Sequence, residues 1–172
     1  LKATMVSTVS PSYADEIQQP AFGEGLDGVL RSREDAVRGI LNGIDDDLWN
    51  PATDPALAAP FHREDLAGKA VDKEALQQQV GLPASPDSPL LGFVGRFTAQ
   101  KGVDVLIDAA PDLVARGCQL VVLGTGDAPL EQSLLDLSAR SEAVAAVVGF
   151  DNDLAHQIFG SCDGLLMPSR YE

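Results

Sequence analysis

The sequence has few basic residues for its length. Its 172 residues include 12 Lys and Arg against 26 Asp and Glu, so the formal net charge is -14. Proteins that bind a nucleic acid place clustered Lys and Arg against its phosphates, and we therefore expect no nucleic-acid partner. A small anionic ligand is not excluded, because a few local donors can outweigh the overall field.

Several other signals are missing as well. Cys118 and Cys162 are the only cysteines, which excludes a disulfide framework. No apolar run approaches the roughly 18 residues of a membrane span, and no signal peptide opens the sequence, so no membrane partner is expected. The spacing of Cys and His suggests no metal site, and the Gly-x-Ser-x-Gly motif of a nucleophile elbow does not occur.

What the sequence does contain is a regular alternation of apolar strands and amphipathic helices. Strands are predicted at 90–94, 120–123, 144–148 and 165–167, and helices between them at 103–114, 130–137 and 154–159. Pro111 is expected to kink or break the first of these helices. This order predicts an α/β fold with a Rossmann-like, parallel, doubly wound sheet, whose ligands bind beyond the carboxyl ends of the strands.

The part before residue 90 is less regular. It predicts strands at 6–9 and 37–41, a short helix near 13–17, a loop at 22–28 and a helix at 69–80. Three consecutive aspartates, Asp45 to Asp47, and the nearby Pro51 and Pro55 are typical of a non-repetitive linker. We therefore assign residues 1–41 to the end of one domain and its hinge strand, 42–60 to an interdomain linker and 61–172 to a second domain.

Two cations follow the first strand of the predicted sheet. Arg96 can donate two parallel hydrogen bonds to phosphate oxygens, and Lys101 adds a point charge just before a helix N-terminus. A phosphate site and a solvated loop with two ordinary surface cations both fit this spacing.

The next loops at the same edge also have two interpretations each. Gly124 and Gly126 can let backbone N–H groups face an anion, or can form a plain turn. Phe150 can stack on a base or cap the core, and Glu172 can hold a sugar hydroxyl or fray at the terminus. His62 and His156 are weak signals, the first expected to be solvated and the second structural.

Taken together, the sequence resembles the family of bacterial glycogen synthases and plant or algal starch synthases. The stretches that carry the resemblance are VSTVSPSYADEI (6–17), GLDGVLRSR (25–33), GILNGIDDDLWNPATD (39–54), GKAVDKEALQQQVGL (68–82), GRFTAQKGVDVL (95–106), QLVVLGTGD (119–127) and LLMPSRYE (165–172). The resemblance implies a GT-B fold, in which two Rossmann-like domains face a cleft. It also implies transfer of glucose from ADP-glucose, or less often UDP-glucose, to the non-reducing end of an α-1,4-glucan, with retention and without a metal or other cofactor.

The resemblance assigns roles to seven residues. Arg96 and Lys101 match the pair that holds the diphosphate, and Glu172 matches the first of two paired glutamates. The other matches are Asn42 in the hinge motif beside the sugar site, Phe150 near the adenine, and Gly124 and Gly126 in a loop close to the nucleotide.

The departures from the family pattern limit what this chain is expected to do alone. The Lys-containing Gly-Gly motif and the histidine of the first domain are absent, and the second glutamate falls beyond residue 172. We expect a fragment that is inactive by itself, from a protein of the bacterial cytoplasm or the plastid stroma. Two alternatives stay open: another retaining GT-B transferase of the sucrose- or mannose-transferring type, and a non-catalytic module that binds a nucleotide or a glucan.

Overall fold

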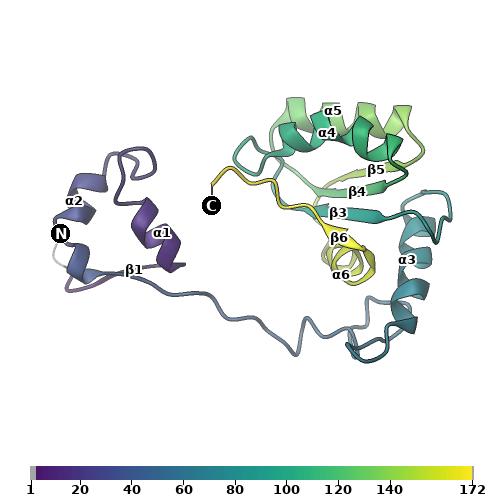
Figure 1. Cartoon of the computed structure of the whole chain (residues 1–172), viewed down its shortest axis with the longest axis horizontal. Coiled ribbons are helices and arrows are strands. Elements are labelled where there is room, and N and C mark those ends of the chain that lie inside the picture. Colours follow the sequence, from purple (N-terminus) through teal and green to yellow (C-terminus); the bar gives the residue numbers. More distant parts are fainter. Residues whose placement is uncertain (1–2, 172) are drawn as a thin grey trace. The chain divides into compact units, whose positions relative to one another are not determined.

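The computed structural model describes residues 3–171 and divides the chain into two compact units that meet between Asp45 and Asp46 (Figure 1). This division falls inside the segment 42–60 that the sequence assigns to a linker. The assignment of the two sides to separate domains of a GT-B protein stays a prediction.

The first unit is small and has little core. Its elements are β1 (Val6–Thr8), α1 (Pro11–Glu16), α2 (Asp27–Arg31), the 3-10 helix η1 (Glu34–Ala36) and β2 (Val37–Gly39), and the two strands pair in parallel. The Ser10 side chain caps α1 by accepting a hydrogen bond from the Tyr13 N–H at 3.0 Å. Ala14 and Val37 are the buried hydrophobic residues among those described in this unit.

One expectation for the first unit was wrong. The loop predicted over 22–28 gives way to helix α2 at Asp27, whose carboxylate lies 2.8 Å from the Arg31 guanidinium one turn later. An acidic residue at a helix start and a basic residue at its end both stabilise such a short helix.

The second unit is a parallel sheet covered on both faces. Its elements are α3 (Ala67–Gln79), β3 (Leu90–Val94), α4 (Val103–Ala115), β4 (Gln119–Gly124), α5 (Ala128–Arg140), β5 (Val144–Val148), α6 (Asn152–Ser161) and β6 (Gly164–Leu165). The strands lie in the order β5-β4-β3-β6, and every neighbouring pair is parallel. The predicted doubly wound, Rossmann-like sheet is confirmed.

Alternate residues of the central strand β4 pack against opposite helical layers. Val121 and Leu123 belong to a core with residues of α3 and α6, whereas Val122 belongs to a core with residues of α4 and α5. Figure 1 shows α4 and α5 together over one face of the sheet, with α6 on the other face. Because both faces are covered, this strand reads as a continuous apolar run.

Two local expectations for this unit need correction. Helix α4 continues through Pro111, which lies on its exposed side, so the predicted break does not occur. Strand β6 pairs with β3 only at Gly164 and Leu165, rather than over 165–167. Beyond it the chain turns toward the loop before α4, where the Arg170 N–H donates to the Gln100 carbonyl at 2.9 Å.

Part of the segment that was predicted to be a linker packs against helix α6 of the second unit. Trp49 stacks on the His156 ring of α6, with ring centroids 3.9 Å apart and an interplanar angle of 13°. His156 Nδ1 lies 2.6 Å from an Asp54 carboxylate oxygen, and both side chains are more than 90% buried. The structural interpretation of His156 agrees with this arrangement, and His62 lies at the surface as expected.

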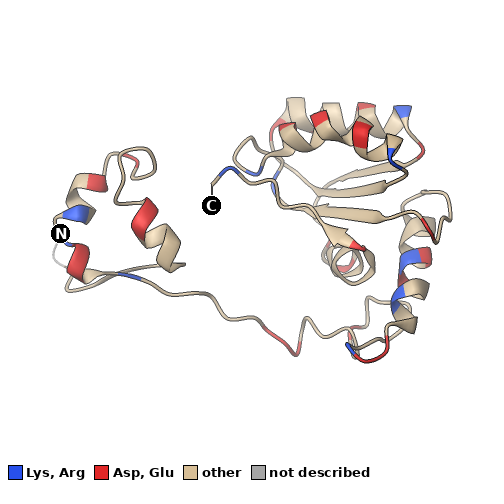
Figure 2. Ribbon diagram, in the orientation of Figure 1, with Lys and Arg blue, Asp and Glu red and all other residues tan. Residues whose placement is uncertain are grey.

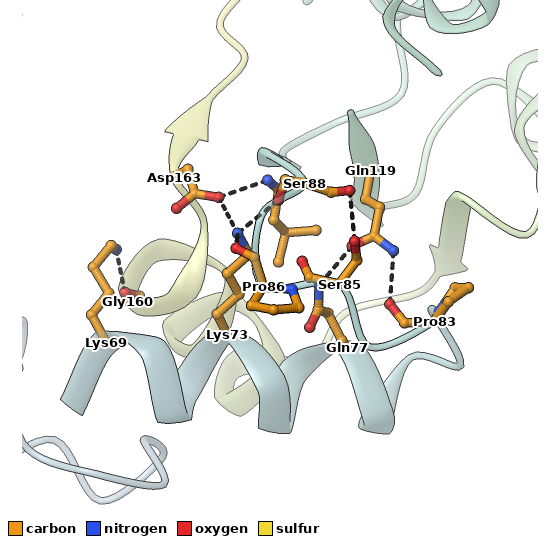
Figure 3. Close-up of polar contacts among 11 residues, drawn as sticks. Lys69, Lys73, Gln77, Pro83, Ser85, Pro86, Ser88, Gln119, Gly160 and Asp163 are labelled. Atoms are coloured by element: carbon orange, nitrogen blue, oxygen red, sulfur yellow. Dashed lines mark hydrogen bonds and ion pairs between the residues drawn. The ribbon is translucent and has the colours of Figure 1, made fainter. Parts of the chain in front are cut away.

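A polar network fixes α3 to the amino ends of the strands (Figure 3). The Lys73 ammonium donates to the Pro86 carbonyl at 3.1 Å, the Ser88 carbonyl at 2.7 Å and the Asp163 carboxylate at 2.7 Å. The same Asp163 oxygen accepts the N–H of Leu90, the first residue of β3, at 2.7 Å. The network therefore lies at the end of the sheet opposite to the carboxyl edge.

Two surface properties follow from the described residues. Acidic positions are spread over the helices of both units and the segment between them, and basic positions are scattered among them (Figure 2). Within residues 3–171, none of the helices has the length and hydropathy of a membrane span.

Candidate functional site

A cavity of about 220 Å³ lies at the carboxyl edge of the sheet, where β3, β4 and β5 end. Its lining comes from three loops and the first turns of α6. The residues that matter below are Arg96, Gly124, Thr125, Phe150 and Asp151. Three of the seven residues predicted for the site, Arg96, Gly124 and Phe150, are thus brought to one cavity by three different strands.

Arg96 projects from the loop that follows β3. This loop continues the sheet pairing for one residue, because the Gly95 N–H donates to the Leu123 carbonyl at 3.0 Å. The Arg96 side chain is exposed, and its guanidinium makes a long contact of 3.5 Å to the Gln100 amide oxygen. A guanidinium held this loosely at a cavity is available to an anionic ligand.

Lys101 sits at the other end of the same loop and does not line the cavity. Its backbone N–H donates to the Thr98 hydroxyl at 3.4 Å, directly before the start of α4. The next residue, Gly102, has a φ of 69° and would place a Cβ only 2.1 Å from the Pro168 carbonyl oxygen. Glycine is required there for both reasons.

The two glycines after β4 serve packing between loops. A Cβ on Gly124 would lie 1.8 Å from the Gly95 carbonyl oxygen, and one on Gly126 would lie 2.3 Å from the Phe97 carbonyl oxygen. The buried Phe97 joins the two loops, since its N–H donates to the Thr125 carbonyl at 3.0 Å. Gly124 lines the cavity and Gly126 does not.

Glu131 already occupies the position that an anion would take beside Gly126. Its carboxylate accepts hydrogen bonds from the Thr125 hydroxyl at 2.6 Å and the Gly126 N–H at 2.8 Å. The Thr125 hydroxyl and then the Gly126 N–H hold the pKa of Glu131 below its usual range. The N–H of Gly126 is therefore committed to a side chain of the protein itself, which sequence reasoning missed.

Phe150 is the most exposed large hydrophobic residue described, with 91% of its surface accessible. This exposure excludes the alternative that it caps the core. The Asp151 side chain next to it accepts the Leu154 N–H at 2.9 Å and so caps α6. An aromatic ring held at the rim of a cavity by a capped helix offers a flat surface to a planar ligand.

The remaining predicted residues lie elsewhere. Asn42 belongs to the first unit, where it is exposed. Glu172 lies outside the described residues, and its predecessor Tyr171 accepts a hydrogen bond from the Gln100 side chain at 3.3 Å. Among residues 3–171, His, Cys, Asp and Glu form no group of three or more that could hold a metal ion.

Two family models match the sequence. The model described as glycosyl transferases group 1 matches residues 88–172, and the model described as starch synthase catalytic domain matches residues 1–32. The chain is 53% identical over 171 residues to glycogen synthase 1 of Methylococcus capsulatus and 51% identical over 172 residues to the glycogen synthase of Rhodospirillum rubrum. Among solved structures, the catalytic domain of starch synthase IV from Arabidopsis thaliana, bound to ADP and acarbose, matches 99% of the chain with a TM-score of 0.92 and 37% identity.

The chain belongs to the glycogen and starch synthase family. It spans 35% and 36% of the lengths of the two bacterial glycogen synthases and 36% of the Arabidopsis chain, while 99% of its own length is matched in each case. A GT-B likeness extends further: HepE of Anabaena, solved with UDP-glucose, matches 97% of the chain with a TM-score of 0.60. At 20% identity that match bears on the fold alone.

Proposed function

We propose that this chain supplies the donor-nucleotide side of a glucosyltransferase that transfers glucose from ADP-glucose to the non-reducing end of an α-1,4-glucan, with retention. The observation that carries the proposal is the cavity that gathers Arg96, Gly124 and Phe150 at the carboxyl edge of a parallel sheet. The family membership and the ADP and acarbose in the Arabidopsis relative support the choice of donor and acceptor. Such an enzyme works in a bacterial cytoplasm or a plastid stroma.

In this proposal the site residues contact different parts of the donor. Arg96 and Lys101 face the diphosphate, which gains negative charge as the glycosidic bond breaks. A cation placed against that charge stabilises the transition state more than the ground state. Phe150 takes the base, and Glu172 holds the sugar and stabilises its developing positive charge.

This chain supplies parts of two domains of the enzyme and the segment between them. Residues 1–41 end the acceptor-side domain, residues 42–60 connect the domains with Asn42 beside the sugar, and residues 61–172 form the first half of the donor domain. We accordingly expect the isolated chain to bind a nucleotide weakly and not to turn over. The partners are then ADP-glucose and the glucan.

Steady-state kinetics of the complete enzyme with ADP-glucose and glycogen test the proposal. Arg96→Ala and Lys101→Ala should each lower kcat/KM by roughly 3 kcal/mol of transition-state stabilisation, or about 100-fold and more. Lys101→Arg should not rescue fully, because a planar fork does not replace a compact ammonium. Glu172→Gln should lower kcat as well.

Arg116→Ala is the matched control, since Arg116 is an exposed arginine at the far end of α4. Near-wild-type kcat/KM for both Arg96→Ala and Lys101→Ala would contradict the phosphate site and favour the alternative, a solvated loop with two ordinary surface cations. Parallel assays with UDP-glucose decide the donor.

A further inference from the structure

The segment after β6 is attached to the first turn of α4 by a bidentate ion pair, and to the loop before α4 by a further hydrogen bond. The Arg170 guanidinium donates to both carboxylate oxygens of Asp104, each at 2.7 Å, and a third bond reaches the Ala99 carbonyl at 2.6 Å. Asp104 lies in the first turn of α4. Arg170 is thereby joined to Asp104, which lies 66 positions earlier in the sequence, and to Ala99, which lies 71 positions earlier.

The backbone of the same segment is attached to the same loop. The Arg170 N–H donates to the Gln100 carbonyl at 2.9 Å, and the Gln100 side chain donates to the Tyr171 carbonyl at 3.3 Å. Gly102 lies so close to the Pro168 carbonyl that it has no room for a side chain. Figure 1 shows the C-terminal segment, in yellow, leaving β6 on this path.

This ion pair is poorly placed to serve stability. The side chains of Arg170 and Asp104 are 45% and 41% exposed, and ion pairs at that exposure contribute little to the free energy of folding. Its geometry is nonetheless specific, because a guanidinium fork fixes a carboxylate in both distance and plane. The hydrogen bonds from Arg170, followed by its charge, hold the pKa of Asp104 below its usual range, so the pair stays charged at neutral pH.

We propose that Arg170 and Asp104 are positioning residues for glucosyl transfer, which lock the 168–171 segment onto the loop that carries Arg96 and Lys101. The inference rests on the proposed function, in which Glu172, the next residue in the sequence, acts on the sugar while the loop holds the diphosphate. The contacts of Arg170 and Asp104 set the distance between the segment that leads to Glu172 and the loop that carries Arg96 and Lys101. Three of the five N–H donors of Arg170 are used by Asp104 and Ala99 in this arrangement, so contacts within the protein set the orientation of its guanidinium.

The test compares kcat and the affinity for ADP in the complete enzyme. Arg170→Ala and Asp104→Ala should each lower kcat about 10- to 100-fold, the range for loss of a supporting contact or a misplacement of about 1 Å. The Kd for ADP, measured by calorimetry, should change less than about threefold, because Arg96 and Lys101 keep their own scaffold. The double variant should be no worse than either single one, since both remove the same lock.

Conservative variants and controls separate the outcomes. Arg170→Lys should remain impaired, because an ammonium cannot fork onto Asp104. Arg63→Ala, which removes an exposed arginine paired with Glu64, should leave kcat unchanged. Thermal unfolding of each variant checks the fold, and if Asp104→Ala unfolds, the isosteric Asp104→Asn carries the same expectation.

Two results would overturn the inference. Wild-type kcat in Asp104→Ala and Asp104→Asn would show that the lock is dispensable. A loss of ADP affinity in Arg170→Ala as large as in Arg96→Ala, with Asp104→Ala unaffected, would make Arg170 a direct ligand. If Arg96→Ala and Lys101→Ala are themselves silent, the proposed function fails first, and that result is distinct from either of these.

Discussion

Phe150 carries the clearest functional expectation for a single residue. Its ring is 91% exposed at the rim of the cavity, where it contributes nothing to the core. Stacking of a base on an aromatic ring is worth about 1–3 kcal/mol, so Phe150→Ala should weaken ADP binding roughly 5- to 100-fold. Phe150→Tyr should bind like the wild type, because it keeps the aromatic face.

Calorimetric titration with ADP measures this effect. Leu135→Ala, which truncates an exposed apolar residue on α5, is the control and should not alter binding. An unchanged Kd for ADP in Phe150→Ala would contradict the proposal that the base stacks on Phe150.

The two cysteines should differ in reactivity. Burial raises the pKa of the Cys162 thiol from 9.0 to about 12, whereas Cys118 is only half-buried. Because the thiolate is the reactive form, an aromatic disulfide reagent at pH 8 should modify one thiol in the folded protein and the second only after unfolding. Cys118→Ser should abolish the fast phase, and fast modification of Cys162 in that variant would contradict the burial.

The same thiol gives stability a dependence on pH. The folded pKa lies above the unfolded value, so the unfolded state loses its proton first as the pH rises. The contribution of Cys162 is therefore complete below about pH 9 and declines from there toward pH 12.

Single residues also show where sequence reasoning ends. The exposure of Phe150 could not be deduced from an aromatic at a strand end, because core and rim positions have the same sequence pattern. Glu131 was missed since it lies in the first turn of α5, and only the fold of the preceding loop brings its carboxylate to Gly126. Arg96 and Gly124, which directly follow or end predicted strands, were placed correctly at the carboxyl edge.

Helix α3 depends on one buried cation. Lys73 donates three hydrogen bonds and is 90% shielded, so Lys73→Ala leaves two carbonyls and the Asp163 carboxylate short of a donor. The free energy of unfolding should fall by about 2–3 kcal/mol, as for a hydrogen bond to a charged group. Urea denaturation measures the loss, with Lys69→Ala on the same helix for comparison.

The pKa of Asp163, the carboxylate partner of Lys73, predicts how this contribution to stability varies with pH. Desolvation raises its pKa, but hydrogen bonds from Leu90 and Lys73 and the two lysine charges together outweigh it, and the pKa lies below 3.8. Because the folded pKa is depressed, the stabilisation is present above about pH 4 and is lost as the pH falls through the folded value. The difference in stability between the wild type and Asp163→Asn should accordingly shrink as the pH falls below about 4, and a difference that does not change with pH would contradict the pairing.

Elements with a long periodic signal were predicted better than short ones. Strands β3 and β5 have the predicted bounds, and α3 and α4 agree within two residues at either end. Helix α2 was missed because five residues give no periodicity, and β6 was displaced because only its pairing with β3 defines where it ends. Pro111 did not break α4, since an exposed helix face can leave one carbonyl to water.

The two units should differ strongly in stability. The first has Ala14 and Val37 as its buried hydrophobic residues, whereas the second has three apolar clusters around a four-stranded sheet. Hydrogen exchange of this chain should therefore show low protection over residues 3–39 and high protection over residues 121–123 of β4. Equal protection in the two regions would show that the first unit is stabilised in a way its core does not explain.

At the scale of the whole chain, Trp49 is the single tryptophan and lies face to face with an imidazole. Its emission therefore carries no background from other indoles. The fluorescence quantum yield of this one ring reports whether Trp49 remains packed on α6. The first turns of α6 also border the cavity. The chain thus contains a built-in fluorescence probe of the contact between Trp49 and α6, which a titration can read without attaching a dye.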